Sequence, residues 1–183
     1  MIPNLNKPPI NWAIEKKLFI KNSVVPIEMC NDIVEYGSAN VMPGKNKYIG
    51  VFSNKFDSCL LPLNHPIHEI LSSVWKEIIE HFQFSIDFIE PYELKRYEND
   101  GFFGKHVDSY YGLDQPLDRK LTMVVQLSDR TEYKGGSLKI VDRVMPKNRG
   151  SVIAFPSYFP HEVIKTLGCR WSLIGWAWGP YWI

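Results

Sequence analysis

Apolar residues in the first half of the chain recur at helical spacing in two segments. The first segment predicts a helix over residues 26–36, which Gly37 can end, and its apolar positions are Ile27, Cys30, Ile33 and Val34. The second predicts a longer helix over residues 67–82, whose apolar stripe is Ile67, Ile70, Leu71, Val74, Ile78 and Phe82. We expect a strand over 12–20 and a loop with a short strand over 39–57.

From residue 84 onward, short strand-like runs follow one another between turn signals. The expected strands are 84–89, 92–97, 102–107, 121–127, 137–141, 151–155, 162–166 and 170–178. Many short strands with no further helix are typical of an antiparallel sandwich or jelly roll, whose ligand site lies in its mouth. The expected fold class is therefore α+β, mainly β. We expect one domain over 1–183, with a helical support over 1–84 and a jelly-roll core over 85–183.

Net charge, cysteine count and the length of apolar runs disfavour several classes of protein. The net charge of +1, from 21 basic and 20 acidic residues, gives no reason to expect a nucleic-acid partner or a membrane surface. Three cysteines without a C-x-x-C pair disfavour a disulfide framework and a structural zinc site. Charged residues interrupt the first 21 positions, and no apolar run reaches the roughly 20 residues of a membrane span. We expect a cytoplasmic protein, monomeric or homodimeric, with no membrane segment.

Candidate chemistry centres on His106 and Asp108. Residues two apart in an extended segment point to the same face, so this pair offers an imidazole and a carboxylate side by side. With His161 it supplies two histidines and one carboxylate, a ligand set typical of non-haem iron(II) oxygenases. Arg170 and Ser172 follow on one face of the last expected strand. A guanidinium fork beside a hydroxyl suits one carboxylate of a small diacid.

Alternation assigns faces to two of these strands. In the strand over 121–127, the apolar face is Leu121, Met123, Val125 and Leu127, and the more mixed face is Thr122, Val124 and Gln126. In the last strand the face that carries Arg170 also carries Ser172, Ile174 and Trp176. The mixed face and the arginine face are the expected lining of the site.

These motifs, in this order, resemble the iron(II)- and 2-oxoglutarate-dependent dioxygenases, in particular the prolyl 4-hydroxylase-like branch. The resemblance runs from about Tyr92 to Pro180. It rests on Tyr97, on residues 106–108, and on blocks at 121–128, 133–138, 146–150, 155–156, 160–163 and 170–176.

The resemblance implies a double-stranded β-helix braced by N-terminal helices. Iron(II) would be bound by His106, Asp108 and His161. Arg170 would pair with the far carboxylate of 2-oxoglutarate, helped by Tyr97, Ser172 or Gln126. The remaining residues expected to line the pocket or contact the substrate are Thr122, Val124, Leu138, Val163, Trp176 and Tyr110. The implied cofactors are iron(II), 2-oxoglutarate and O2, with ascorbate keeping the iron reduced.

The implied reaction is hydroxylation of a C–H bond of a peptidyl proline, with release of succinate and CO2. The partner would then be a protein or peptide. The same chemistry on a free amino acid, a small metabolite or a nucleobase stays open, because Gln126 and Arg170 stand where some relatives have tyrosine and lysine. A nucleobase is the least favoured, since no arginine follows Arg170. The alternative of another class is a jelly-roll binding module without catalysis.

Overall fold

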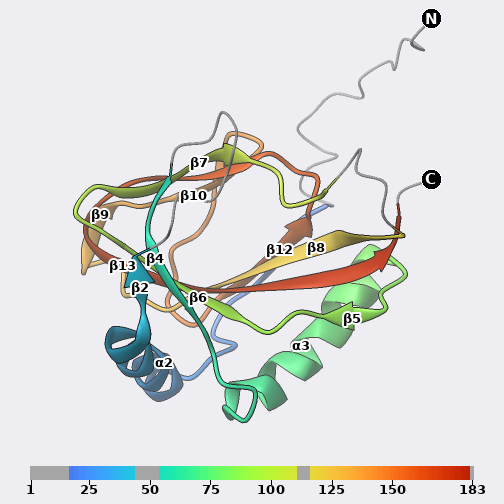
Figure 1. Ribbon diagram of the computed structural model, residues 1–183, viewed down its shortest axis with the longest axis horizontal. Helices are drawn as coiled ribbons and strands as arrows, with labels where there is room; N and C mark the ends of the chain where they lie inside the picture. Colours follow the sequence, from blue (N-terminus) through green and yellow to red (C-terminus); the bar gives the residue numbers. More distant parts are fainter. Residues whose placement is uncertain (1–16, 44–53, 111–115, 182–183) are drawn as a thin grey trace, which may run out of the picture.

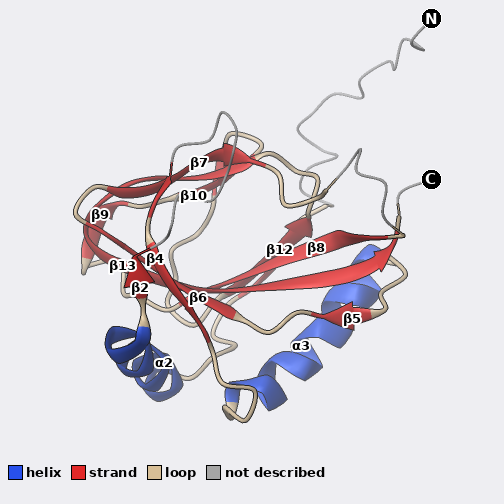
Figure 2. Cartoon of the chain, in the orientation of Figure 1, coloured by secondary structure: helices blue, strands red, loops and turns tan. Residues whose placement is uncertain are grey.

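Two facing antiparallel sheets and two helices form the part of the protein that the computed structural model describes, residues 17–43, 54–110 and 116–181 (Figures 1 and 2). The helices are α2 (Ile27–Asn40) and α3 (Ile67–Phe82). The strands are β1 (Phe19–Lys21), β2 (Met42–Pro43), β3 (Asn54–Lys55), β4 (Asp57–Leu60), β5 (Phe88–Ile89), β6 (Glu93–Glu98), β7 (Gly101–His106), β8 (Leu117–Gln126), β9 (Tyr133–Gly135), β10 (Leu138–Ile140), β11 (Arg143–Val144), β12 (Val152–Pro156) and β13 (His161–Pro180). This is the expected jelly roll.

The larger sheet has the order β1-β12-β8-β13-β6-β4-β2, and both helices cover its outer face (Figure 1). Their apolar stripes pack on the outward side chains of β8 and β13 to form the first core. Its members include Ile33, Ile67, Leu71, Trp75, Leu121, Met123, Val125, Leu127 and Leu173. The alternation expected in β8 is confirmed, because its apolar face lies in this core.

The smaller sheet is built on the first half of β13, which pairs with β7, β9 and β10. A second core fills the space between the two sheets. It contains Tyr97, Phe103, Val124, Leu138, Ile140, Ile153, Phe155, Val163, Ile174 and Trp176. The mixed face of β8 therefore turns inward, toward the mouth of the jelly roll.

The two strands expected over 162–166 and 170–178 are one strand, β13, which belongs to both sheets. Val163 pairs with Phe103 of β7, and Thr166 pairs with Gly101. β13 therefore spans three residues where its partner β7 spans only two. This β-bulge puts one extra residue into β13. It explains why odd-numbered residues face inward at the start of the strand and even-numbered residues face inward from Arg170 onward.

Helix α2 continues past Gly37 to Asn40, so the expectation that Gly37 ends it was wrong. Gly37 is buried where the helix meets the sheet, and a Cβ atom there would lie 2.6 Å from Trp171 Cζ3 and even closer to Leu94 Cδ2. The glycine therefore permits close packing rather than a helix end. Helix α3 has the expected bounds, and Ile67 N donates a hydrogen bond to His65 Nδ1 at its start, 3.2 Å away.

Other strand boundaries also differ from expectation. β5 contains only the end of the strand expected over 84–89, and Phe84 and Ile86, which precede it, pack against the helix–sheet core. β9 was missed because Gly135 resembles a turn residue, yet it allows close approach to the Lys165 carbonyl of β13. β1 is confined to 19–21 in the described residues, and residues 12–16 and 48–52 lie outside them. No described helix is long and apolar enough to cross a membrane.

Candidate active site

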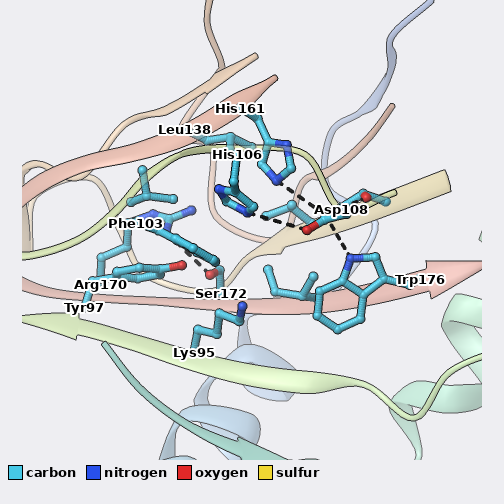
Figure 3. A pocket seen from close by; sticks show the side chains of 14 residues that line it. Lys95, Tyr97, Phe103, His106, Asp108, Leu138, His161, Arg170, Ser172 and Trp176 are labelled. Atoms are coloured by element: carbon cyan, nitrogen blue, oxygen red, sulfur yellow. Dashed lines mark hydrogen bonds and ion pairs between the residues drawn. The ribbon is translucent and has the colours of Figure 1, made fainter. Parts of the chain in front are cut away.

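Three potential metal ligands meet between the sheets at one end of the jelly roll. His106 ends β7, Asp108 follows it, and His161 begins β13, directly opposite His106 in the strand pairing. His106 Nε2 lies 3.5 Å from Asp108 Oδ1, and His161 Nε2 lies 3.4 Å from Asp108 Oδ2. All the ligand atoms lie within 4.8 Å of one another, so the cluster fits a single metal ion (Figure 3).

The other ring nitrogens of both histidines are held by the backbone. His106 Nδ1 lies 2.8 Å from the Gly104 carbonyl oxygen, and His161 Nδ1 lies 2.9 Å from that of Phe159. A carbonyl oxygen accepts a hydrogen bond from a protonated Nδ1, and in the neutral ring this leaves Nε2 unprotonated and turned toward the cluster. The backbone therefore selects the tautomer that binds a metal.

Asp108 is oriented by two side chains of the larger sheet. Its Oδ2 accepts hydrogen bonds from Thr122 Oγ1 at 2.8 Å and from Trp176 Nε1 at 2.9 Å. Thr122 and Trp176 are neighbours across β8 and β13, so the inner face of one sheet fixes a ligand carried by the other. Such outer contacts commonly set the orientation of metal ligands.

The electrostatics of the cluster favour metal binding. Burial lowers the pKa of His106, which keeps its imidazole neutral. Burial alone would raise the pKa of Asp108, but the facing His161 and His106 outweigh it and hold that pKa well below its usual range. The carboxylate is therefore ionised and the His106 imidazole is neutral near neutral pH, the forms that a metal ion requires.

Arg170 is a buried cation that lines the inner cavity. Its side chain is only 1% exposed, its Nη2 donates to Gln126 Oε1 at 2.9 Å, and its Nη1 lies 3.4 Å from Ser172 Oγ. Its Nε has no hydrogen-bond partner, and no carboxylate of the described residues forms an ion pair with it. A buried guanidinium without a carboxylate fits a ligand that supplies one, such as 2-oxoglutarate.

Tyr97, on β6, lies opposite Arg170 of β13. The guanidinium carbon of Arg170 is 5.2 Å from the centre of the Tyr97 ring. Burial raises the pKa of Tyr97, so its hydroxyl stays protonated and can donate a hydrogen bond. Both residues open onto the same cavity as the triad, so the donor set fits iron together with a dicarboxylic cosubstrate.

The structure brings nearly all the expected site residues to one cavity between the sheets. Those that line it are Tyr97, His106, Asp108, Thr122, Val124, Leu138, His161, Val163, Arg170, Ser172 and Trp176. Gln126 contacts Arg170 but does not line the cavity. Tyr110 lines an adjoining outer cavity of about 240 Å³.

Several residues that line these cavities were not named as site residues from the sequence: Glu93, Lys95, Phe103, Val107, Ser109 and Arg119. Lys95 precedes Tyr97 by two positions in an extended run, so alternation would have placed it on the same inner face. Arg119 gave no such signal, because β8 begins earlier than its apolar pattern indicates.

Residues 92–178 match the family model of the 2OG-Fe(II) oxygenase superfamily. A PKHD-type hydroxylase of Acinetobacter baumannii (strain AYE) is 29% identical over 178 residues, covering 89% of this chain and 73% of the relative.

Two solved structures share the fold at 14% identity. One is the viral collagen prolyl hydroxylase of Paramecium bursaria Chlorella virus-1 in complex with 2OG, with a TM-score of 0.72 over 89% of this chain and 96% of that one. The other is a Trichoplax adhaerens prolyl hydroxylase bound to a peptide fragment of the hypoxia inducible factor oxygen degradation domain, with a TM-score of 0.68 over 91% and 86%. The match over residues 92–178 and the hydroxylase relative support membership of the 2OG-Fe(II) oxygenase superfamily, and the chain has the fold of the prolyl hydroxylase structures.

Proposed function

We propose that this oxygenase hydroxylates a peptidyl proline, using iron(II), O2 and 2-oxoglutarate and releasing succinate and CO2. The observation that carries the proposal is the pairing of a complete triad with a buried arginine that has no carboxylate partner among the described residues. His106, Asp108 and His161 would hold the iron. Bound iron and 2-oxoglutarate would together supply the oxidising power, and the protein would supply orientation and exclusion of side reactions.

Arg170 would bind the far carboxylate of 2-oxoglutarate. The Tyr97 hydroxyl, on β6, would donate a hydrogen bond to the same carboxylate, and Ser172 lies close enough to Arg170 to contact that carboxylate as well. Gln126 holds the guanidinium in place through its side-chain oxygen. These contacts would orient the cosubstrate so that its other end reaches the triad.

The lining of the cavity supports a proline side chain as the target. Trp176, Phe103 and Tyr110 offer aromatic surface beside the metal ligands, and a saturated ring packs well on such surfaces. Leu138, Val163 and Val124 close the inner wall. Structural relatives with this fold include a collagen prolyl hydroxylase and a prolyl hydroxylase bound to a peptide, which supports a peptide as substrate here.

The first test is anaerobic titration of the metal-free protein with iron(II) and then 2-oxoglutarate. We expect a visible charge-transfer band that is lost in Asp108→Ala and weakened in Arg170→Gln. The second test is mass spectrometry of proline-containing peptides after aerobic turnover, where the expected product is one oxygen heavier. Absence of the band in a folded protein would contradict the cofactor assignment. A band without any modified peptide across a broad set would contradict the substrate assignment.

A further inference from the structure

Lys95 is a buried cation that has no part in the roles assigned so far. It lies on β6, two residues before Tyr97 and directly opposite Ser172 of β13. Only 6% of the residue is exposed, and it lines both the inner cavity and the outer one. Figure 3 shows its side chain below the triad, with Trp176 on one side and Tyr97 and Arg170 on the other. The ammonium therefore lies on the floor between the cosubstrate pocket and the outer cavity.

Three aromatic rings and the carboxylate of Glu93 are among the groups that contact this ammonium. Its Nζ lies 4.6 Å from the ring centre of Phe56, 4.9 Å from that of Phe103 and 5.5 Å from that of Trp176. Glu93, two positions earlier on the same face, places its Oε2 3.3 Å from Nζ. The rings stabilise a cation through their π faces, and the glutamate compensates its charge. The lysine is thus kept charged inside a mostly apolar cavity.

A purely structural role explains this arrangement poorly. Burying an ion pair costs about as much desolvation free energy as the attraction returns, and an apolar side chain of the same length often serves the fold better. The inner cavity that Lys95 lines contains rings and aliphatic groups such as Trp176 and Ile174, on which methionine would pack, beside polar residues such as Ser172. Glu93 is more exposed than Lys95, with 23% of its side chain accessible against 7%. The carboxylate therefore faces the mouth while the ammonium faces inward.

We propose that Lys95 is a specificity-determining residue whose ammonium donates a hydrogen bond to a carboxyl-type oxygen of the substrate residue that is hydroxylated. In a peptide this oxygen is the main-chain carbonyl, and in a free amino acid it is the carboxylate. Glu93 acts as a positioning residue that holds the lysine. The inference rests on the proposed function, because it assumes that the substrate occupies the outer cavity beside the triad.

The stability of the metal-free protein tests, without any substrate, whether the Lys95–Glu93 pair serves the fold. Lys95→Met removes a charge that the fold does not need and leaves Glu93 able to reach water, so the melting temperature stays equal or rises. Glu93→Gln leaves the buried ammonium without its carboxylate and lowers the melting temperature by about 3 °C or more. Lys21→Met, which breaks the exposed pair with Glu77, is the matched control and changes little. A fall of more than about 1 °C in Lys95→Met would make the ion pair structural and overturn the proposal.

The affinity for 2-oxoglutarate, measured from the anaerobic charge-transfer band, shows whether Lys95 contacts the substrate or the cosubstrate. Lys95→Met should bind 2-oxoglutarate as wild type does, because Arg170 supplies that contact. A loss of affinity beyond about threefold would assign Lys95 to the cosubstrate and overturn the proposal.

Turnover assays then show which substrate oxygen Lys95 contacts, the main-chain carbonyl or the free carboxylate. The probes are a proline-containing peptide amide and free L-proline. For the probe that the wild type hydroxylates, Lys95→Met should raise KM about tenfold or more and form more succinate per hydroxylated product, and Lys95→Arg should recover part of the loss. An unchanged KM would overturn the proposal. If the wild type hydroxylates neither probe, the proposed substrate class fails, and the melting and 2-oxoglutarate results still support or overturn the assignment of Lys95.

Discussion

Replacing Thr122 with valine is expected to lower the affinity of the triad for iron(II) about tenfold. Thr122 Oγ1 donates to Asp108 Oδ2 at 2.8 Å and also lies 3.0 Å from Ser157 Oγ, and the residue is only 1% exposed. Valine has nearly the same shape, so the change removes a hydroxyl without opening a cavity.

The expected magnitude follows from comparing the empty and occupied sites. A hydrogen bond to a charged group contributes about 1.5–3 kcal/mol, but the variant loses it in both states. The affinity for iron(II) falls only because the Asp108 side chain moves more freely in the empty site of the variant and must be ordered when the metal binds. A cost of about 1.4 kcal/mol for ordering the carboxylate again corresponds to a tenfold weaker site. The free energy of unfolding should fall by about 1–2 kcal/mol, since Ser157 also loses a neighbour.

Isothermal titration calorimetry under anaerobic conditions measures this affinity directly. Thr166→Val is a matched control, because Thr166 is fully buried in β13 and its hydroxyl makes no hydrogen bond with the described residues. That variant should bind iron(II) as the wild type does. Equal affinities for wild type and Thr122→Val would refute the view that the facing sheet orients Asp108, and Trp176→Phe would then be expected to have no effect either.

Two further predictions concern the stability of the fold. Gly37→Ala gains about 1 kcal/mol of helix propensity but forces a Cβ atom against Trp171 and Leu94, so it should lower the free energy of unfolding by about 1–2 kcal/mol in urea titrations. Ser38→Ala, on the exposed side of the same helix, should not lower it. A more stable Gly37→Ala protein would contradict this packing. Burial raises the pKa of Tyr92 to about 12. The folded state therefore holds this proton more tightly than the unfolded state, so the contribution of the neutral tyrosine is complete below pH 10 and is lost as the pH rises to about 12. The free energy of unfolding should fall by up to about 3 kcal/mol across that window, and Tyr92→Phe should remove this part of the slope; an identical slope in the variant would contradict the assignment to Tyr92.

The sequence predicted those parts of the site that depend on residue type and strict alternation. Thr122 and Val124 face inward as expected, and so do Arg170, Ser172 and Trp176. Alternation is a local property of extended chain, so it survives folding wherever a strand is regular.

What the sequence could not predict depends on contacts between distant segments. The bulge after Val163 changes which residues face inward, and only pairing with β7 reveals it. Gly37 resembled a helix end because the side chains that exclude a Cβ atom there, Leu94 and Trp171, come from β6 and β13. Alternation with Tyr97 could place Lys95 on the inner face, but not beside the rings of Phe56, Phe103 and Trp176, which other strands and turns bring to it.

The continuous strand β13 also constrains how this protein can diverge. It carries His161 in one sheet and Arg170 in the other, and the single extra residue between Val163 and Thr166 brings both onto the inner surface. Losing or gaining one residue between the two would turn every later side chain to the opposite face. Arg170 and Trp176 would then point toward the helices. Insertions that alter substrate choice are therefore expected in the surface turns that connect the strands, while the length of β13 between these two residues stays fixed.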